Sequence, residues 1–239
     1  MISLILISIV VIGLDVVTSM HLVWIRPTFG DSGSAAPTTT IEDWSHHRVG
    51  THGVPDGWQG ESWGKTSSFD LTIESDGNRR VLHLRSRSDR STINRDLRGV
   101  VDLKKTPILE WSWKVVTLPP GGDARRRQTT DQAAQIYVVW ARPPEILRSR
   151  IIGYAWDTTA PAGEIIKSKK TGTVTYVIMR SGGDKLGTWL TERRNVADDF
   201  RKIYGEEPGN PTALSISIDS NDTRSEAESY IGAIAFRAP

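Results

Sequence analysis

Ile108-Leu-Glu-Trp-Ser-Trp-Lys-Val-Val116 is the stretch that decides the fold. Its large apolar residues, Leu109, Trp111, Trp113 and Val115, alternate with polar ones. Successive side chains of a β-strand point to opposite faces of the sheet, so this alternation places the four apolar residues on one face. We therefore expect a half-buried strand whose two tryptophans pack in the core.

The same alternation recurs on both sides of this strand. Apolar positions alternate over residues 69–73 and resume at 82–84 across the turn Asp76-Gly77-Asn78, which predicts a hairpin. Further strands are predicted at 135–140, 151–156, 173–179, 213–219 and 230–236. Asn195 is placed to cap one short helix over Val196–Tyr204. Many strands joined by Gly and Pro turns indicate a mostly β domain, an antiparallel β-sandwich of jelly-roll type.

The N-terminal region is organised differently. Residues 1–25 form an apolar run without Lys or Arg, and this run is long enough to cross ~30 Å of hydrocarbon as a helix. Residues 26–40 are rich in Gly, Ser, Thr, Ala and Pro, which predicts a flexible linker. We therefore expect an apolar N-terminal helix, the linker, and one β-sandwich domain over residues 41–239.

The apolar segment is interpreted either as a retained membrane anchor or as a signal segment. Trp24 and Arg26 stand where interfacial anchors belong, which favours a single-span transmembrane helix. A signal peptide normally has a basic start and a small-residue cleavage site, and the nearest such site is Ser34-Ala35-Ala36. The first interpretation puts the domain on the extracytoplasmic, periplasmic face of a membrane. The alternative is secretion after cleavage.

Composition excludes several classes of protein. Thirty Lys and Arg residues against 28 Asp and Glu leave a net charge of +2, too slight for a nucleic-acid-binding surface. The absence of Cys excludes disulfide frameworks, thiolate metal sites and cysteine nucleophiles. Nine Trp exceed four Phe, so we expect some indole rings to contact a ligand. Trp58, Trp63 and Trp189 stand in loop-like contexts where a sugar could stack on an exposed ring.

No catalytic constellation is recognised, and we predict no catalytic residue. The chain lacks a Gly-x-Ser-x-Gly motif and has no His after His83, which argues against a Ser-His-Asp hydrolase. A glycosidase needs two carboxyl groups about 5 to 9 Å apart, and nothing in the spacing of Glu110, Asp131 and Asp157 selects a pair. His83 itself lies on the polar face of a predicted strand beside Arg85, which indicates solvated charge.

Two groups of residues have the chemistry of metal ligands. The loop Asp219-Ser-Asn-Asp-Thr223 gathers oxygen atoms, although it departs from the EF-hand pattern at the glycine and glutamate positions. We keep two interpretations of it, a calcium site on Asp219 and Asp222 and an ordinary turn held by Asx hydrogen bonds. His46 and His47 with His52 could supply imidazoles, but their spacing matches no standard site. No other cofactor is predicted.

Basic residues gather in two stretches, Arg125-Arg126-Arg127 and the Arg-rich segment 79–98. Either stretch could meet acidic head groups or an acidic partner. The favoured interpretation is solvated charge paired with Asp89, Asp96 and Asp102.

An ordered set of motifs runs through the predicted domain. Trp111-x-Trp113 and Leu118-Pro119 are followed by residues 131–140, Tyr154-x-Trp156 and Leu186-Gly187-x-Trp189. With the acidic loop 219–223, this set resembles a bacterial family known as domain of unknown function 3047, over roughly Trp44 to Phe236. The resemblance implies an extracytoplasmic β-rich domain akin to carbohydrate-binding sandwiches, without an established activity.

The chain departs from the family pattern just before Ile136. There the family has two adjacent acids and a basic residue, whereas this sequence has Thr130-Asp131 and Gln135. We interpret the change as the loss of an inherited polar site in a copy adapted to binding a partner.

Three hypotheses of function follow. The first is a non-catalytic, membrane-anchored extracytoplasmic binding protein, an accessory subunit of a membrane complex with a protein partner. The second is a carbohydrate-binding module that uses Trp58, Trp63, Trp189, Asp131 and Gln135. The third is a glycan-cleaving enzyme.

Overall fold

The structure is a computed structural model that describes residues 36–61 and 67–239. The apolar segment 1–25 lies outside the described residues, so its helix stays a prediction. No described helix is long and apolar enough to span a membrane. Ala36–Pro239 forms one compact unit, and its first strand, β1, occupies Thr38–Glu42. Residues 38–40, predicted as the end of the linker, therefore belong to this strand.

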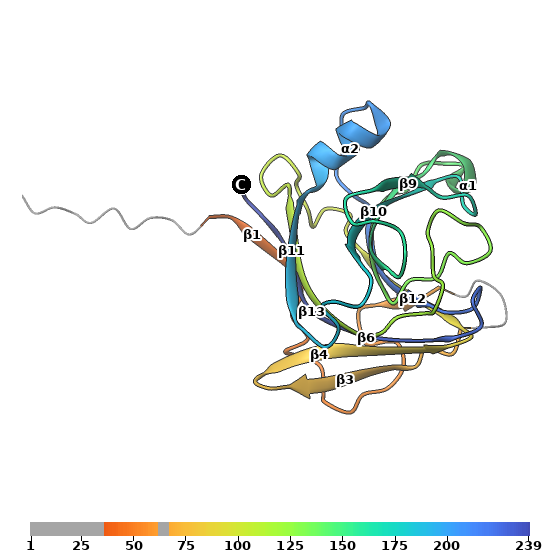
Figure 1. The fold of residues 1–239 in the computed structure, drawn as a ribbon. Helices are drawn as coiled ribbons and strands as arrows, with labels where there is room; N and C mark the ends of the chain where they lie inside the picture. Colours follow the sequence, from red (N-terminus) through yellow and green to blue (C-terminus); the bar gives the residue numbers. More distant parts are fainter. Residues whose placement is uncertain (1–35, 62–66) are drawn as a thin grey trace, which may run out of the picture. The chain divides into compact units, whose positions relative to one another are not determined.

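Two β-sheets make up the described unit (Figure 1). The six-stranded sheet has the order β11 (Leu190–Asn195), β6 (Ile108–Thr117), β13 (Glu226–Arg237), β4 (Arg79–Arg87) and β3 (Leu71–Asp76), with β1 paired to β13. The seven-stranded sheet has the order β2 (Gln59–Gly60), β5 (Arg90–Asp96), β12 (Ala213–Asp219), β7 (Ala134–Trp140), β8 (Arg150–Asp157), β10 (Val174–Ser181) and β9 (Ile165–Lys167). The mostly β class is thus confirmed. The sandwich is not purely antiparallel, because β8 and β10 pair in parallel.

The strongly periodic elements lie where the sequence predicts them. The 108–116 strand is β6, and the hairpin is β3 and β4 around Gly77, whose φ of 63° suits glycine. The predicted helix is α2 (Val196–Tyr204), and the Asn195 side chain accepts hydrogen bonds from the N–H groups of Ala197 and Asp198. One further short helix, α1, spans Glu145–Arg148. Figure 1 shows α2 at the opposite end of the sandwich from the β3–β4 hairpin.

The main core lies between the two sheets. Trp111 and Trp113 are 0% exposed, which confirms their predicted burial. Their rings meet edge to face at 5.3 Å, and each also contacts an aromatic ring from β8 of the other sheet. Trp111 lies 5.3 Å from Tyr154, and Trp113 lies 6.0 Å from Trp156. These two tryptophans therefore join the two sheets.

A second, smaller apolar cluster covers the other face of the seven-stranded sheet. It includes Tyr137 of β7 and Tyr176 of β10, together with Ala124 and Ala160 from the neighbouring loops. Asp157, at the end of β8, fastens both loops, because its carboxylate accepts hydrogen bonds from the N–H groups of Ala124 and Ala160 at 2.9 and 2.6 Å. Buried apolar side chains and two fastened loops therefore cover part of the outer face of this sheet.

Candidate functional site

Polar side chains from four strands meet on the outer face of the seven-stranded sheet. Arg90 of β5 is the direct cross-strand partner of Asp219 of β12. Gln135 and Tyr137 come from β7, and Tyr176 from β10. Their strand neighbours, such as Ile136, Ile218 and Val177, belong to the main core, so the alternation turns these five polar side chains outward. We call Arg90, Gln135, Tyr137, Tyr176 and Asp219 the Arg90 cluster.

Hydrogen bonds run through the Arg90 cluster from ring to carboxylate. The Tyr137 hydroxyl donates to Gln135 Oε1 and lies 3.5 Å from the Tyr176 hydroxyl. Gln135 Nε2 donates to Asp219 Oδ1 at 3.0 Å, and the Gln132 N–H donates to the same oxygen at 2.6 Å. One chain of contacts therefore couples both tyrosines to Asp219.

Gly153 of β8 makes room for the two tyrosine rings. A Cβ at this position would lie 2.7 Å from Tyr137 Cε1 and 3.1 Å from Tyr176 Cδ1. The rings are 6.2 Å apart and lie over this position. Glycine is therefore required for both rings to approach the sheet as closely as they do.

The electrostatics of the Arg90 cluster are unusual for a protein surface. Burial raises the pKa of Asp219 to about 7, and the nearby Asp131 carboxylate adds to the rise while Arg90 opposes it. Burial also raises the pKa of Tyr137 well above its ordinary value. A carboxyl group that titrates near neutral pH, in a set of coupled polar groups, is a common property of functional sites.

Several buried polar atoms around the cluster have no hydrogen-bond partner among the described residues. They are Arg90 Nε, Thr130 Oγ1 and Gln132 Oε1. The Arg90 guanidinium forms no ion pair with any described residue, although it is only partly exposed. Native proteins leave few buried polar groups unpaired, so ordered water or another molecule is expected to pair with these atoms.

The sequence-predicted polar residues converge on this region with different roles. Gln135 and Asp219 belong to the Arg90 cluster. Asp131 instead holds the neighbouring loop, because its carboxylate accepts hydrogen bonds from the N–H groups of Asp222 and Thr223 at 3.1 and 2.6 Å. Asp222 binds Lys170 Nζ at 2.6 Å. Asp222 pairs with an ammonium, and Asp219 Oδ1 accepts hydrogen bonds from the Gln132 N–H and Gln135 Nε2, so both carboxylates of the predicted calcium site are engaged by protein groups.

Two of the three tryptophans predicted to bind a ligand, Trp58 and Trp189, belong to the described residues. Trp63 lies outside the described residues. Trp58 is buried rather than exposed, because its ring stacks on Trp44 at 5.7 Å and its Nε1 donates to a buried carboxylate, that of Glu42. The apparent loop around it is therefore part of the core.

Trp189 is half-buried on the six-stranded sheet. Its Nε1 donates to Asp76 Oδ2 at 2.7 Å, and the cationic groups of Arg79 and Lys114 each lie 5.3 Å from the ring centroid. Trp189 is thus held by an acid and two cations, and its contact with a ligand stays a prediction.

The acids considered for glycoside hydrolysis are engaged elsewhere. Glu110 lies on the six-stranded sheet and pairs with Arg193 and Arg237. Asp131 and Asp157 each hold backbone N–H groups of loops. No pair of these carboxylates is left facing a common space, so the structure offers no support for a glycosidase centre.

His83 is buried, and the expectation of a solvated side chain was wrong. Its two ring nitrogens lie 2.7 Å from carboxylate oxygens of Glu74 and Glu228, and its ring stacks on Tyr230 at 4.1 Å. The ordinary alternation hides this arrangement, because both carboxylates come from neighbouring strands.

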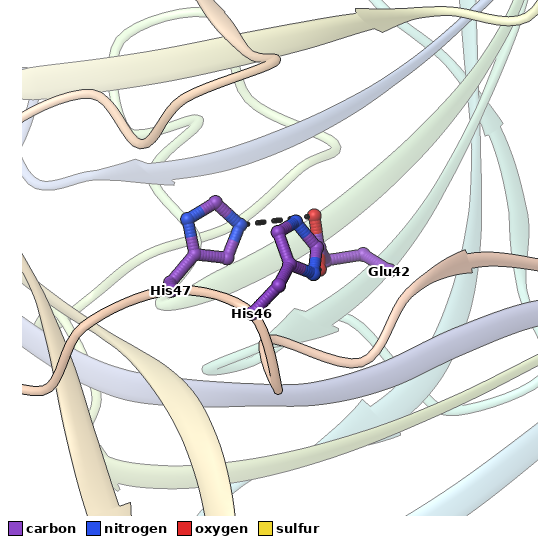
Figure 2. A group of neighbouring side chains, drawn as sticks. All are labelled: Glu42, His46 and His47. Atoms are coloured by element: carbon purple, nitrogen blue, oxygen red, sulfur yellow. Dashed lines mark hydrogen bonds and ion pairs between the residues drawn. The ribbon is translucent and has the colours of Figure 1, made fainter.

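One group of potential metal ligands occurs among the described residues, namely Glu42, His46 and His47 (Figure 2). His47 Nε2 lies 3.4 Å from Glu42 Oε2, and His46 Nδ1 lies 3.9 Å from Glu42 Oε1. His52, the third imidazole considered from the sequence, instead contacts Thr72 at 3.0 Å.

The protein already saturates the Glu42 carboxylate. Oε1 accepts hydrogen bonds from the N–H groups of Asp43 and Trp44 at 3.0 and 2.8 Å. Oε2 accepts them from Trp58 Nε1 at 3.1 Å and Arg95 Nη1 at 2.6 Å. A carboxylate offers about four lone-pair positions, so a metal ion would have to displace these donors and approach the Arg95 charge. We therefore regard this group as a structural centre that joins β1, β5 and Trp58.

Sequence reasoning missed Arg90, Tyr137 and Tyr176. Arg90 belongs to the 79–98 stretch interpreted as solvated charge, and the two tyrosines belong to the predicted strands 135–140 and 173–179, where they were not singled out. The available signal was that Arg90, Thr92 and Asn94 alternate as polar residues on one face of a strand. This alternation becomes visible only once β5 is recognised as a strand.

Comparisons with known proteins identify a family and remote structural likenesses. The model of a family described as "Protein of unknown function (DUF3047)" matches residues 56–235. A search of curated proteins finds no match.

Among solved structures, the chain is similar to the CBM22-1 xylan-binding domain of Xyn10C from Paenibacillus barcinonensis. The identity is 14%, the match covers 86% of this chain and 98% of that one, and the TM-score is 0.38. It is also similar to the family 30 carbohydrate-binding module of the cellulosomal cellulase Cel9D-Cel44B of Clostridium thermocellum. Here the identity is 12%, the coverage 83% and 96%, and the TM-score 0.44.

Proposed function

The chain belongs to the DUF3047 family of proteins of unknown function, and from this premise we propose that its β-sandwich is a non-catalytic carbohydrate-binding domain. The ligand binds at the Arg90 cluster on the outer face of the seven-stranded sheet. The observation that carries this proposal is the set of buried polar groups without protein partners around Arg90.

The chemistry of the Arg90 cluster suits a polyhydroxylated ligand. A sugar hydroxyl both donates and accepts hydrogen bonds, and the partly exposed Arg90 guanidinium supplies donors to it, while Gln135 and Asp219 are buried. Tyr137 and Tyr176 are only 8% and 7% exposed, so the ligand reaches the site mainly through the partly exposed Arg90. A few convergent polar groups beside aromatic rings are typical of small-ligand sites.

The same site offers little to a catalytic reaction. Its one carboxylate is bonded to Gln132 and Gln135, and the described residues around it include no histidine and no serine positioned by a base. Binding without turnover is therefore the function that this geometry supports best.

A glycan array tests the proposal. The full chain should bind a glycan, and Arg90→Gln should weaken that binding at least tenfold while circular dichroism and melting stay as in the wild type. Arg98→Gln is the matched control, because it removes an exposed arginine just beyond the same strand. Absence of binding to neutral and acidic glycans alike, or equal binding by Arg90→Gln, would refute the proposal.

We retain the membrane anchor and a protein partner as a separate proposal that rests on residues 1–25. In this proposal the domain is displayed on the extracytoplasmic face by an uncleaved helix. The intact mass of the native protein tests it, because a mature N-terminus near Pro37 would remove the anchor. A detergent pull-down without a stable partner would count against the accessory role.

A further inference from the structure

Arg90 is an exception among the arginines of the described residues. Every other partly buried arginine forms an ion pair with a carboxylate. These are Arg85, Arg95, Arg125, Arg142, Arg150, Arg180, Arg194 and Arg237. Arg90 makes no ion pair with a described residue, and its Nε is buried without a hydrogen bond. The other partly buried guanidinium groups are therefore each paired with a carboxylate, whereas Arg90 has no carboxylate partner among the described residues.

The nearest carboxylate does not take the place of the missing partner. Asp219 stands directly opposite Arg90 in the sheet, but no ion pair of 4.0 Å or less joins them. Asp219 Oδ1 is instead bonded to the Gln132 N–H and to Gln135 Nε2. At neutral pH Asp219 is also only partly ionised, because its pKa is about 7.

Burial disfavours the charged form of the Arg90 guanidinium, but attraction from Tyr137, Asp219 and other neighbours outweighs burial and raises its pKa. An anionic group of a bound molecule would add to this attraction. The guanidinium presents a planar fork of N–H donors that fits a carboxylate in a bidentate manner. The other groups near Arg90, the two tyrosine hydroxyls and the Gln135 amide, are neutral and buried, so they do not compete for that carboxylate.

We propose that the ligand of this site is an acidic glycan whose uronate carboxylate pairs with the Arg90 guanidinium. This inference rests on the proposed carbohydrate-binding function and narrows its ligand class. Arg90, the one partly exposed residue of the cluster, is then the residue that distinguishes acidic from neutral glycans.

Matched pairs of oligosaccharides test the inference. Trigalacturonate and trimannuronate are titrated calorimetrically into the full chain, beside their fully methyl-esterified forms and the neutral cellotriose and xylotriose. We expect at least one acid to bind tenfold or more tightly than its ester. This preference should disappear in Arg90→Gln, return in part in Arg90→Lys, and persist in the control Arg98→Gln.

The outcomes separate this inference from the proposed function. Equal affinity for an acid and its ester, or tighter binding of the neutral sugars, would overturn the acidic class and leave carbohydrate binding intact. Absence of binding to every sugar would overturn both. Inorganic sulfate that binds as tightly as the best acid would reduce the site to an anion site and overturn the glycan. If Arg90→Gln unfolds, Arg90→Lys provides the second test, because it keeps the charge but loses the planar fork and should reduce the preference for the acid over its ester.

Discussion

β5 carries two arginines that meet buried carboxylates in opposite ways. Arg95 binds Glu42 at 2.6 Å within a carboxylate site that is filled by backbone and indole donors. Arg90, five residues earlier, faces Asp219 without an ion pair. The first region is a completed internal contact, whereas the second has polar groups left over. This difference is the basis of our proposal that the first region stabilises the fold and the second binds a ligand.

The pKa values of the two carboxyl groups show the same contrast. Burial alone would raise the pKa of Glu42, but the hydrogen bonds from Trp58 and the Trp44 N–H, together with Arg95, outweigh burial and lower it. At Asp219 burial prevails, and the pKa rises to about 7. The ionised form of Glu42 therefore stabilises the fold. Ionisation of Asp219 lowers the free energy of unfolding instead, because its carboxylate is buried.

Glu42 also supports a strained backbone. Trp44 has a φ of 63°, which a bulky residue rarely adopts, and such strain costs about 1 to 3 kcal/mol. The Glu42 carboxylate accepts the Trp44 N–H, and Trp44 Nε1 donates to the Gly232 carbonyl at 2.9 Å. These contacts hold Trp44 in place against the strain.

The largest effect on stability is expected in the core that carries both regions. Trp113→Ala should lower the free energy of unfolding by ~3 to 5 kcal/mol, because it removes a fully buried ring and leaves a cavity. Urea denaturation followed by tryptophan fluorescence measures the loss. A melting temperature close to that of the wild type would contradict the assignment of this face as core.

Glu42→Gln should cost ~3 kcal/mol, because it removes the charge from a filled site and leaves Arg95 without its partner. Glu226→Gln is the control, since its pair with Arg87 is exposed and should contribute less than ~1 kcal/mol. Because the pKa of Glu42 is lowered, its stabilisation is present above the ordinary glutamate pKa and is lost as the pH falls through the folded-state value. Equal urea midpoints for the two variants would remove the contrast between the regions.

Asp219→Asn should act in the opposite direction. The folded-state pKa of Asp219 is about 7, above the ordinary value of 3.8. The free energy of unfolding of the wild type is therefore largest, as far as this group is concerned, below pH 3.8, and it falls as the pH rises towards 7 and the buried carboxyl group ionises. The variant should therefore gain stability relative to the wild type between about pH 4 and pH 7, by a few kcal/mol at most. Thermal melts across this range measure the difference, and a constant difference would contradict the raised pKa.

Arg90→Gln should change the free energy of unfolding by less than ~1 kcal/mol, since no ion pair with a described residue is lost. Arg95→Gln should cost more, because it leaves the buried Glu42 carboxylate short of a donor. Urea denaturation of the two variants side by side is the direct test of the comparison. A larger loss for Arg90→Gln would show that Arg90 serves folding.

The smallest expected effect is that of zinc on the Glu42 group. A tenfold excess of zinc should leave the melting temperature unchanged, because the carboxylate is already saturated by protein donors. A rise that disappears in His47→Ala would instead identify a metal site.

Local periodicity was enough to predict the mostly β class. The alternation of residues 108–116 defines the core strand β6, and the Asn195 cap defines the start of α2. Both signals are contained in a few consecutive residues, so they can be read without knowing the rest of the fold. The motif set likewise led to the family now matched over residues 56–235.

The strand β5 shows why the candidate site could not be predicted in the same way. Its sequence, Arg-Ser-Thr-Ile-Asn-Arg-Asp, has only one large apolar residue, because its outward face carries polar residues and its inward Arg95 is neutralised by Glu42. Only the pairing of β5 with β12 shows that Arg90 stands opposite Asp219. Local and global signals often disagree in this manner at functional sites.

The sequence alone determined which residues alternate, where the helix is capped, and that Gln135 and Asp219 are chemically suited to a site. Tertiary structure decided that Trp58 is core, that Glu42 is filled, and that Arg90 has no described partner. The physical reason is that alternation depends on neighbours along the chain. Burial and charge compensation depend instead on side chains that strand register brings together from distant positions.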